Sequence, residues 1–235
     1  MKLTTTLLFI ALYTSALAQS RGERISFHPT MNGESMEIGQ SYYATALKDS
    51  VRFDALKFYI SAIQLFQDEQ LVFTLQKKHY LIDLENRESL IVDLKTKEDV
   101  DFKKGEGFDL KYNRIQFSLG VDSLTNSSGA FGGDLDPTNG MYWTWQSGYI
   151  NFKLEGVSKV CPARKNVFQF HLGGFLGEEN ALQKISLAVS GKDNKIEFAI
   201  DEWLEQINLK EQYQIMSPSV EAVKMSKLVA DLFKI

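Results

Sequence analysis

The chain has 235 residues, of which 44% are hydrophobic and 24% charged, and its formal net charge is −4. This composition is typical of a globular protein, and the acidic balance argues against a nucleic-acid or anionic-membrane partner, because both attract a basic surface. The single cysteine, Cys161, and the three histidines exclude an intrachain disulfide, a cysteine-rich zinc site and an iron–sulfur cluster.

The first residues have the pattern of a secretory signal peptide. Lys2 precedes the apolar run Leu3–Leu17, which ends in the cleavage pattern Ala16-Leu17-Ala18. We therefore expect residues 1–18 to be removed and the product to be located in the periplasm or outside the cell. No later run is long enough to span a bilayer, so no membrane insertion is expected. An exported chain without disulfides indicates a bacterial source.

Cleavage at this position makes Gln19 the first residue of the exported protein. Mass spectrometry of protein recovered from outside the cytoplasm should find this N-terminus and no peptide from the apolar run. Recovery of an intact Leu3–Leu17 segment would contradict the prediction.

Residues 19–235 are predicted to form a single, mainly β domain. The turn dipeptide Asn32-Gly33 favours a hairpin between Ile25–Phe27 and Met36–Ile38. Four runs further along are strongly apolar and are expected to be the more central strands: Leu56–Leu65, Leu71–Leu75, Tyr80–Leu84 and Leu90–Leu94. Five later runs alternate apolar and polar residues, as half-buried strands do: Asn113–Leu119, Ile150–Glu155, Phe168–Leu172, Ile185–Val189 and Ile196–Ile200. Many short strands with little helical signal predict a two-sheet β-sandwich of Greek-key type.

The C-terminal segment has a helical pattern instead. Met225, Leu228, Val229 and Leu232 recur with the spacing of one helix face, and Ser217-Pro218 supplies an N-cap and a first-turn proline. We predict an amphipathic helix that packs on the sandwich. The run Trp203–Leu209 fits either a short helix or an edge strand, and its pattern does not distinguish them.

The segment Gly129–Gly148 combines glycines and aspartates with an aromatic run. The run contains Met141, Tyr142, Trp143 and Trp145. An extended backbone would place the two tryptophans on the same side, because side chains alternate along a strand.

Two aspartates, Asp134 and Asp136, precede the aromatic run and could bind calcium. They match the first and third positions of an EF-hand loop, but Asn139 stands where that loop needs glycine, and Trp145 where it needs glutamate. A loose calcium site therefore remains an alternative to an Asx turn, in which Asp136-Pro137 sets a tight bend. The turn is the favoured interpretation for Asp136.

The three histidines lie far apart in the sequence. His171 falls on the polar face of a predicted strand, where a histidine is usually solvated, yet Gly173-Gly174 follows and lets a ligand or another backbone come close. His28 lies near the expected mature N-terminus, and His79 has the sequence context of a surface residue. No pair has the local spacing of a zinc motif, so a metal site would have to be assembled from distant strands.

Motifs of the common enzyme classes are missing from the sequence, which contains no G-x-S-x-G, P-loop or H-E-x-x-H pattern. Cys161 and His171 could act as a nucleophile pair only if a third group oriented them, and a lone cysteine is more often a small buried residue. The residues therefore indicate a binding module and not an enzyme.

Four strings of the sequence resemble the MbnP-like domain family. They are FDALKFYISAIQL, IQFSLGVD, LDPTNGMYWTWQSGYINFKLEG and FQFHLGG, and they occur in order along most of the expected mature chain. The resemblance implies an exported, β-rich protein, in some relatives associated with methanobactin and copper acquisition and encoded near a MauG-like di-haem partner. In some relatives, histidine imidazoles bind copper(I) beside a tryptophan that has been oxidised to kynurenine.

Carried onto this sequence, the resemblance implies that His171 is a copper ligand, with His28 as a second candidate. Trp143 or Trp145 would be the modified tryptophan, and the sulfur of Met141 would favour copper(I). The sequence departs from copper-binding relatives in one respect, because Trp143-Thr144-Trp145 stands where they can carry a Trp-x-His arrangement.

Two functional hypotheses follow. The first is a periplasmic copper carrier or scavenger with an oxidised tryptophan. The second is a ligand- or protein-binding module whose aromatic platform consists of Tyr142, Trp143, Trp145 and Tyr149. The two differ in their dependence on His171, because a copper site would need its imidazole and an aromatic platform would not.

Overall fold

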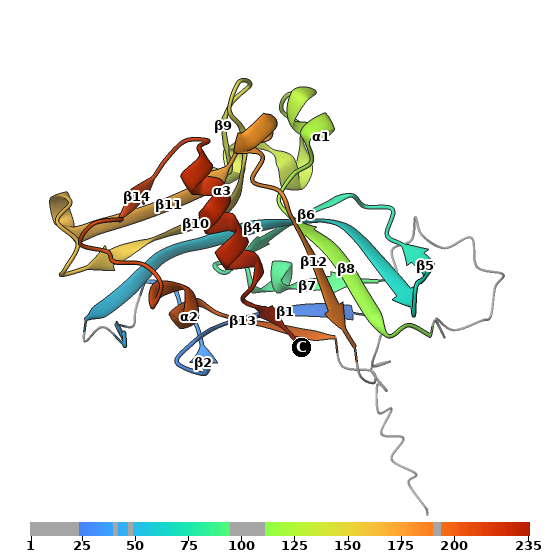
Figure 1. Ribbon diagram of the computed structural model, residues 1–235, viewed down its shortest axis with the longest axis horizontal. Helices are drawn as coiled ribbons and strands as arrows, with labels where there is room; N and C mark the ends of the chain where they lie inside the picture. The colour runs from blue at the N-terminus through green and yellow to red at the C-terminus, as the bar shows by residue number, and fades with distance from the viewer. Residues whose placement is uncertain (1–23, 40–41, 47–48, 95–110, 190–193) are drawn as a thin grey trace, which may run out of the picture.

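A computed structural model describes residues 24–39, 42–46, 49–94, 111–189 and 194–235 (Figure 1). The predicted signal peptide, residues 1–18, lies outside the described residues. Within the described part of the chain, no helix is long and apolar enough to cross a membrane.

Among the described residues, the smaller of the two sheets has five strands, ordered β15-β13-β1-β2, with β7 also paired to β1. Its central pair, β1 and β13, runs parallel, while the other pairs are antiparallel. The strands are β1 (Arg24–Met31), β2 (Glu34–Ser35), β7 (Ile91–Asp93), β13 (Lys195–Ala199) and β15 (Phe233–Lys234).

In the part of the chain that the structure describes, the larger sheet has ten strands and is ordered β12-β8-β4-β10-β11-β14. The long strand β4 also pairs with β3, β5 and β6, and β9 pairs with β10. The strands are β3 (Tyr43–Ala44), β4 (Ser50–Gln67), β5 (Gln70–Thr74), β6 (His79–Asp83), β8 (Arg114–Leu119), β9 (Tyr142–Thr144), β10 (Gly148–Ser158), β11 (Val167–Gly173), β12 (Gln183–Ala188) and β14 (Gln214–Ile215).

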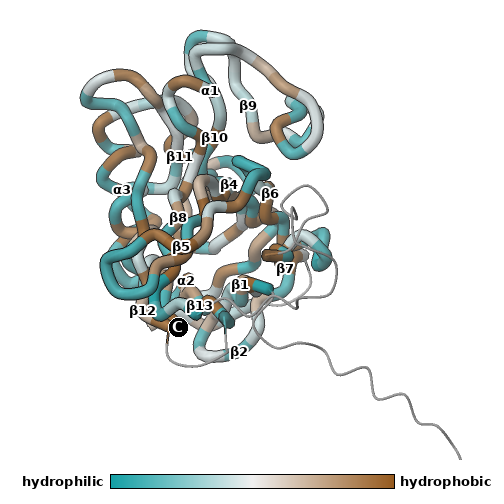
Figure 2. The backbone as a smooth tube through the Cα atoms, turned by 90° about the vertical axis from the view of Figure 1, so that its right-hand side faces the viewer, coloured by the Kyte–Doolittle hydropathy of each residue, from teal (hydrophilic) through white to brown (hydrophobic). Residues whose placement is uncertain are grey.

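Short helices connect the strands and cover their ends. The α-helices are α1 (Ser123–Ser127), α2 (Ile200–Leu204) and α3 (Val220–Ala230). The 3-10 turns are η1 (Arg87–Leu90), η2 (Gly133–Leu135), η3 (Pro137–Asn139), η4 (Arg164–Asn166) and η5 (Gly177–Glu179). In both views α1 and β9 lie at one end of the molecule and β2 lies toward the other (Figures 1 and 2).

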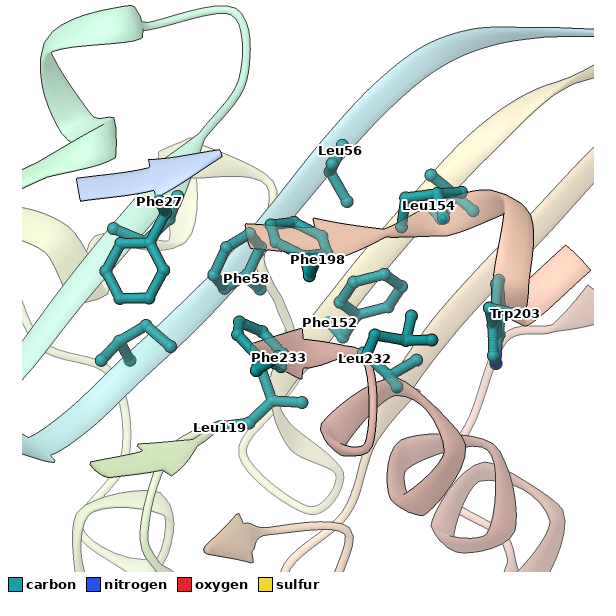
Figure 3. Packing of buried hydrophobic residues seen from close by; sticks show 14 of the residues in the cluster. Phe27, Leu56, Phe58, Leu119, Phe152, Leu154, Phe198, Trp203, Leu232 and Phe233 are labelled. Atoms are coloured by element: carbon teal, nitrogen blue, oxygen red, sulfur yellow. The ribbon is translucent and has the colours of Figure 1, made fainter. Parts of the chain in front are cut away.

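The main core fills the space between the two sheets and is rich in phenylalanine (Figure 3). Phe27 of β1 contacts Phe58 of β4 and Phe117 of β8 edge-on, with ring centroids 5.9 and 6.0 Å apart. Phe198 and Phe233 stack on each other at 4.9 Å and complete the cluster from the small sheet. Edge-to-face and offset-stacked pairs are the favoured aromatic geometries, so the two sheets are joined by well-packed rings.

Helix α3 packs against β11 and β12 and extends the core beyond the small sheet. Its buried face contains Met225 and Val229, as the sequence pattern predicted. The predicted N-cap was wrong by two residues, because Ser219 and not Ser217 caps the helix, accepting a hydrogen bond from the Ala222 N–H at 3.0 Å.

The predicted fold is confirmed as mainly β, with two packed sheets and a C-terminal helix. Asn32 and Gly33 both have positive φ, at 56° and 77°, as a two-residue hairpin turn requires. The second hairpin strand is β2, however, and Met36–Ile38 lies outside it. The run Trp203–Leu209 is neither a helix nor an edge strand over its length, because α2 ends at Leu204 and residues 205–209 lie in turns and irregular backbone; Trp203 itself belongs to α2 and is fully buried.

Of the four runs predicted to be the more central strands, only Leu56–Leu65, within β4, has that position; among the described strands β5 and β6 each pair with β4 alone, and β7 pairs with β1 alone. The run Leu71–Leu75 departs most, because β5 contains no buried residue among Gln70–Thr74. Apolar composition alone therefore overestimated its burial, since β5 is an edge strand with Leu71 exposed.

Candidate functional site

The face of the large sheet that points away from the main core carries a second, smaller hydrophobic cluster. This outer cluster consists of Tyr59, Val121, Leu135, Met141, Tyr149 and Ile150. Tyr59 donates a hydrogen bond to the Asp134 carbonyl at 3.0 Å, and Tyr149 donates one to the Leu135 carbonyl at 2.9 Å. Burial raises the pKa of Tyr59, which keeps its hydroxyl protonated as the donor. These bonds hold the segment between β8 and β10 over the outer face.

Trp143 lies at the edge of the outer cluster, against the last residue of β11. A Cβ atom on Gly173 would lie 2.9 Å from Cζ3 and 3.1 Å from Cη2 of Trp143, and 2.5 Å from the Tyr149 carbonyl oxygen. Only glycine leaves room for this contact. The predicted close approach of another backbone is met at Gly173 by the Tyr149 carbonyl, and the indole of Trp143, a side chain that the prediction did not include, approaches there as well.

The prediction that Trp143 and Trp145 share one side is wrong. Strand β9 ends at Thr144, and Trp145 belongs to the following turn, where 72% of its surface is exposed. Trp143 is half-buried. The two indoles therefore occupy different environments, because the extended backbone on which the prediction depended stops between them.

The four aromatic residues of the proposed platform do not form one surface. Tyr149 is fully buried, and Tyr142 packs on it with ring centroids 4.8 Å apart. Only Trp145 of the four presents most of its surface to solvent. A flat stacking platform is therefore not present in this arrangement.

His171 lies on the same outer face as Gly173, two residues earlier on β11. Its side chain is only 8% exposed, so the solvated histidine expected from the alternation is wrong. Its Nε2 lies 2.6 Å from Oε1 of Glu155 on β10, and its buried Nδ1 has no hydrogen-bond partner among the described residues. The structure therefore brings His171 and Glu155 together and places Trp143 against Gly173, two residues further along β11.

The carboxylate of Glu155 is stabilised in its ionised form. The hydrogen bond from His171 and the nearby ammonium of Lys153 lower the pKa of Glu155 to about 2, against the opposing effect of partial burial. Glu155 was not identified from the sequence. Its position in the alternating run of β10, on the face opposite Leu154, was the available signal.

The other two histidines lie elsewhere. His28 is on β1, facing away from the main core, with its Nε2 3.1 Å from the Ser26 hydroxyl. Since His171 faces outward from the other sheet, the core separates the two residues. His79 is nearly buried rather than at the surface, with its Nε2 3.1 Å from Asp122, and burial lowers its pKa. The described residues contain no cluster of three or more histidine, cysteine, aspartate or glutamate side chains.

Met141 and the two aspartates already have structural roles. Met141 is fully buried in the outer cluster. Asp134 accepts hydrogen bonds from the Leu81 N–H at 3.0 Å and from Lys77 at 2.8 Å. Asp136 caps η3 by accepting from the Thr138 N–H and hydroxyl, which confirms the Asx turn. The two carboxylates thus have separate protein partners.

Cys161 is buried, as expected of a lone cysteine, and its thiol lies 3.0 Å from the Val167 carbonyl oxygen. The Nε2 atom of His171 is instead hydrogen-bonded to the carboxylate of Glu155. The thiol and the imidazole therefore have different hydrogen-bond partners, and the structure does not join them as a nucleophile pair.

Replacing Gly173 by alanine should displace Trp143 and destabilise the protein by about 1–3 kcal/mol, the usual cost of overpacking. Denaturant unfolding measures the stability, and tryptophan fluorescence reports the displaced indole. Gly132→Ala is the matched control, because a Cβ there meets no atom within 4 Å. Equal stability of the Gly173→Ala variant and the wild type would refute the close contact.

Comparison with family models identifies one family, and comparison with solved structures finds a similar fold. A model of the MbnP family matches residues 21–218. Among solved structures, the chain is similar to MbnP from Methylosinus trichosporium, with 14% sequence identity and a TM-score of 0.54. That similarity covers 85% of this chain and 86% of the other. A search of curated proteins finds no match.

Proposed function

Because this chain belongs to the MbnP family, we propose that it is an exported, non-catalytic protein that binds copper(I) through His171. The observation that carries the proposal is a nearly buried imidazole whose Nδ1 lacks a partner among the described residues. A buried polar atom without a hydrogen bond is costly and needs a reason to persist. A metal ion bound to that nitrogen would supply the missing interaction.

The side chains around His171 fit copper(I) better than a structural zinc ion. Imidazole is a good copper ligand, whereas structural zinc requires four protein ligands. The described residues offer no cluster of that kind. His171 would hold the metal, and the half-buried Trp143 lies on the same face of β11, against Gly173. Few side chains near His171 could bind the metal ion, which suits a carrier or scavenger that must release its metal.

Trp143, and not Trp145, is the proposed site of oxidation to kynurenine. Its Nε1 is buried without a partner among the described residues, and its ring packs beside the strand that carries His171. Kynurenine would add an aromatic amine and a ketone, both possible donors to a nearby metal. The oxidant would come from a MauG-like di-haem protein, the partner that the family resemblance implies.

A second candidate function, binding of a partner protein, is favoured by exposed apolar residues at the end near α1 and β9. They are Leu124, Phe131, Trp145 and Leu176. Their segments contact one another, since Ser123 donates to the Phe175 carbonyl at 2.9 Å, and the Phe131 N–H donates to Tyr149. Residues 115–152 and 172–183 contain no lysine or arginine, so a partner with a basic rim would fit.

Competition titration of the purified protein with a chromophoric copper(I) chelator tests the primary proposal. We expect the protein to withdraw about one copper ion per chain from the chelator, with protein isolated from its native periplasm as the preferred sample. Failure to compete with any chelator in a series of decreasing affinity would refute copper binding. Partner binding would then be the remaining candidate function.

A further inference from the structure

The bond between Glu155 and His171 determines which imidazole nitrogen is available. The two residues lie diagonally on adjacent strands, because Lys153 pairs with His171 and Glu155 pairs with Gln169. An ionised carboxylate can only accept hydrogen bonds. With Oε1 of Glu155 2.6 Å from Nε2, the hydrogen of a neutral His171 must be on Nε2. The lone pair is then on Nδ1, the buried atom that has no partner among the described residues.

Glu155 is itself held in position by two further donors. Lys153 Nζ lies 3.6 Å from Oε1 of Glu155, and Gln169 Nε2 donates to the same oxygen at 3.4 Å. Lys153 in turn donates to the Gly140 carbonyl at 3.3 Å, which connects the group to the segment that carries Trp143. The carboxylate is therefore a fixed acceptor, and the imidazole plane that it orients is fixed with it.

We propose that Glu155 is a positioning residue that holds His171 as the Nε2–H tautomer and presents Nδ1 to the copper ion. This inference rests on the proposed copper function, but its first consequence concerns the metal-free protein. Histidine ligands usually donate their second ring N–H to a carboxylate or carbonyl, which fixes the tautomer and raises the basicity of the ligating nitrogen. The Glu155–His171 pair has this arrangement.

Nitrogen NMR of the metal-free protein tests the inference directly. In protein labelled with ¹⁵N-histidine at alkaline pH, His171 should show a protonated Nε2 and a bare Nδ1. Glu155→Ala should give a mixture of tautomers, and Glu155→Gln should largely restore the wild-type pattern, because an amide oxygen also accepts. Glu155→Leu serves the same purpose as the alanine variant if that variant does not fold. Glu197→Ala, on a strand of the other sheet, is the matched control.

Copper(I) titration of the same variants gives a second result. Glu155→Ala should weaken binding by about 10- to 100-fold, the usual effect of losing such a partner, and Glu155→Gln should weaken it less. An unchanged tautomer in Glu155→Ala would overturn the inference, whatever the copper affinity. A changed tautomer in a protein that binds no copper would uphold the positioning role of Glu155 and refute the proposed function instead.

Discussion

Replacing His171 by alanine should lower copper(I) affinity by about 100-fold or more, because loss of a ligand costs more than the 10- to 100-fold loss typical of an outer-shell partner. Among the described residues, His28 lies on β1 and His79 on β6, and Cys161 is buried in the main core on the other side of the sheet, so none of them is placed to take over. The measurement is competition against a copper(I) chelator of known affinity, with folding of each variant checked by circular dichroism.

His28→Ala is the matched control for this experiment. His28 is also a partly buried strand histidine, but it faces outward from the small sheet and should leave the affinity unchanged. Equal affinities of wild type and His171→Ala would remove His171 as a ligand. A loss in His28→Ala alone would move the site to the other sheet and contradict the arrangement described above.

The fold could be predicted from the sequence where local physics determines it. Alternation in Arg114–Leu119 and Val167–Gly173 reports one buried and one outward face, and Asn32-Gly33 tolerates the positive φ of a tight hairpin turn. The predictions that were wrong concern the position and burial of a strand, which depend on the strands next to it in the sheet. Among the described strands β5 pairs with β4 alone, so Leu71 is exposed and Val72 and Phe73 are only partly buried against the main core, and no pattern within Gln70–Thr74 records that position.

The candidate site could be predicted only in part, for the same reason. Alternation assigns His171 to the outer face, but it does not predict that the side chain is nearly buried there, nor that Trp143 from a distant segment packs against Gly173 on the same face. The partnership with Glu155 depends on the register between β10 and β11, which a single sequence does not specify. The sequence identifies His171 and the two tryptophans as candidate site residues. The tertiary structure was needed to choose between Trp143 and Trp145.

Protein isolated from its native host should carry kynurenine at Trp143, and protein made in a foreign host should carry tryptophan there. The reason is position: Trp143 packs against the strand that holds His171, whereas the exposed Trp145 lies beyond the end of β9. Oxidation by the di-haem partner with a peroxide or dioxygen co-substrate would cleave the Cγ–Cδ1 bond, leaving oxygen on both carbons; hydrolysis would then release Cδ1 as formate, so the orphaned Nε1 becomes the amine of kynurenine. Peptide mapping by mass spectrometry of both preparations locates the modification.

Two variants expressed in the native host separate the roles of the tryptophans. Trp143→Phe should abolish kynurenine altogether, because Trp145 is too exposed to be held beside the metal site. Trp145→Phe should retain the modification at Trp143, at a lower yield if the exposed indole relays charge or contacts the oxidising partner. Kynurenine at Trp145, or unmodified tryptophan at both positions in copper-replete native protein, would refute the assignment. Trp143 would then be a packing residue, as a half-buried indole against a glycine ordinarily is, and His171 would have to bind copper without it.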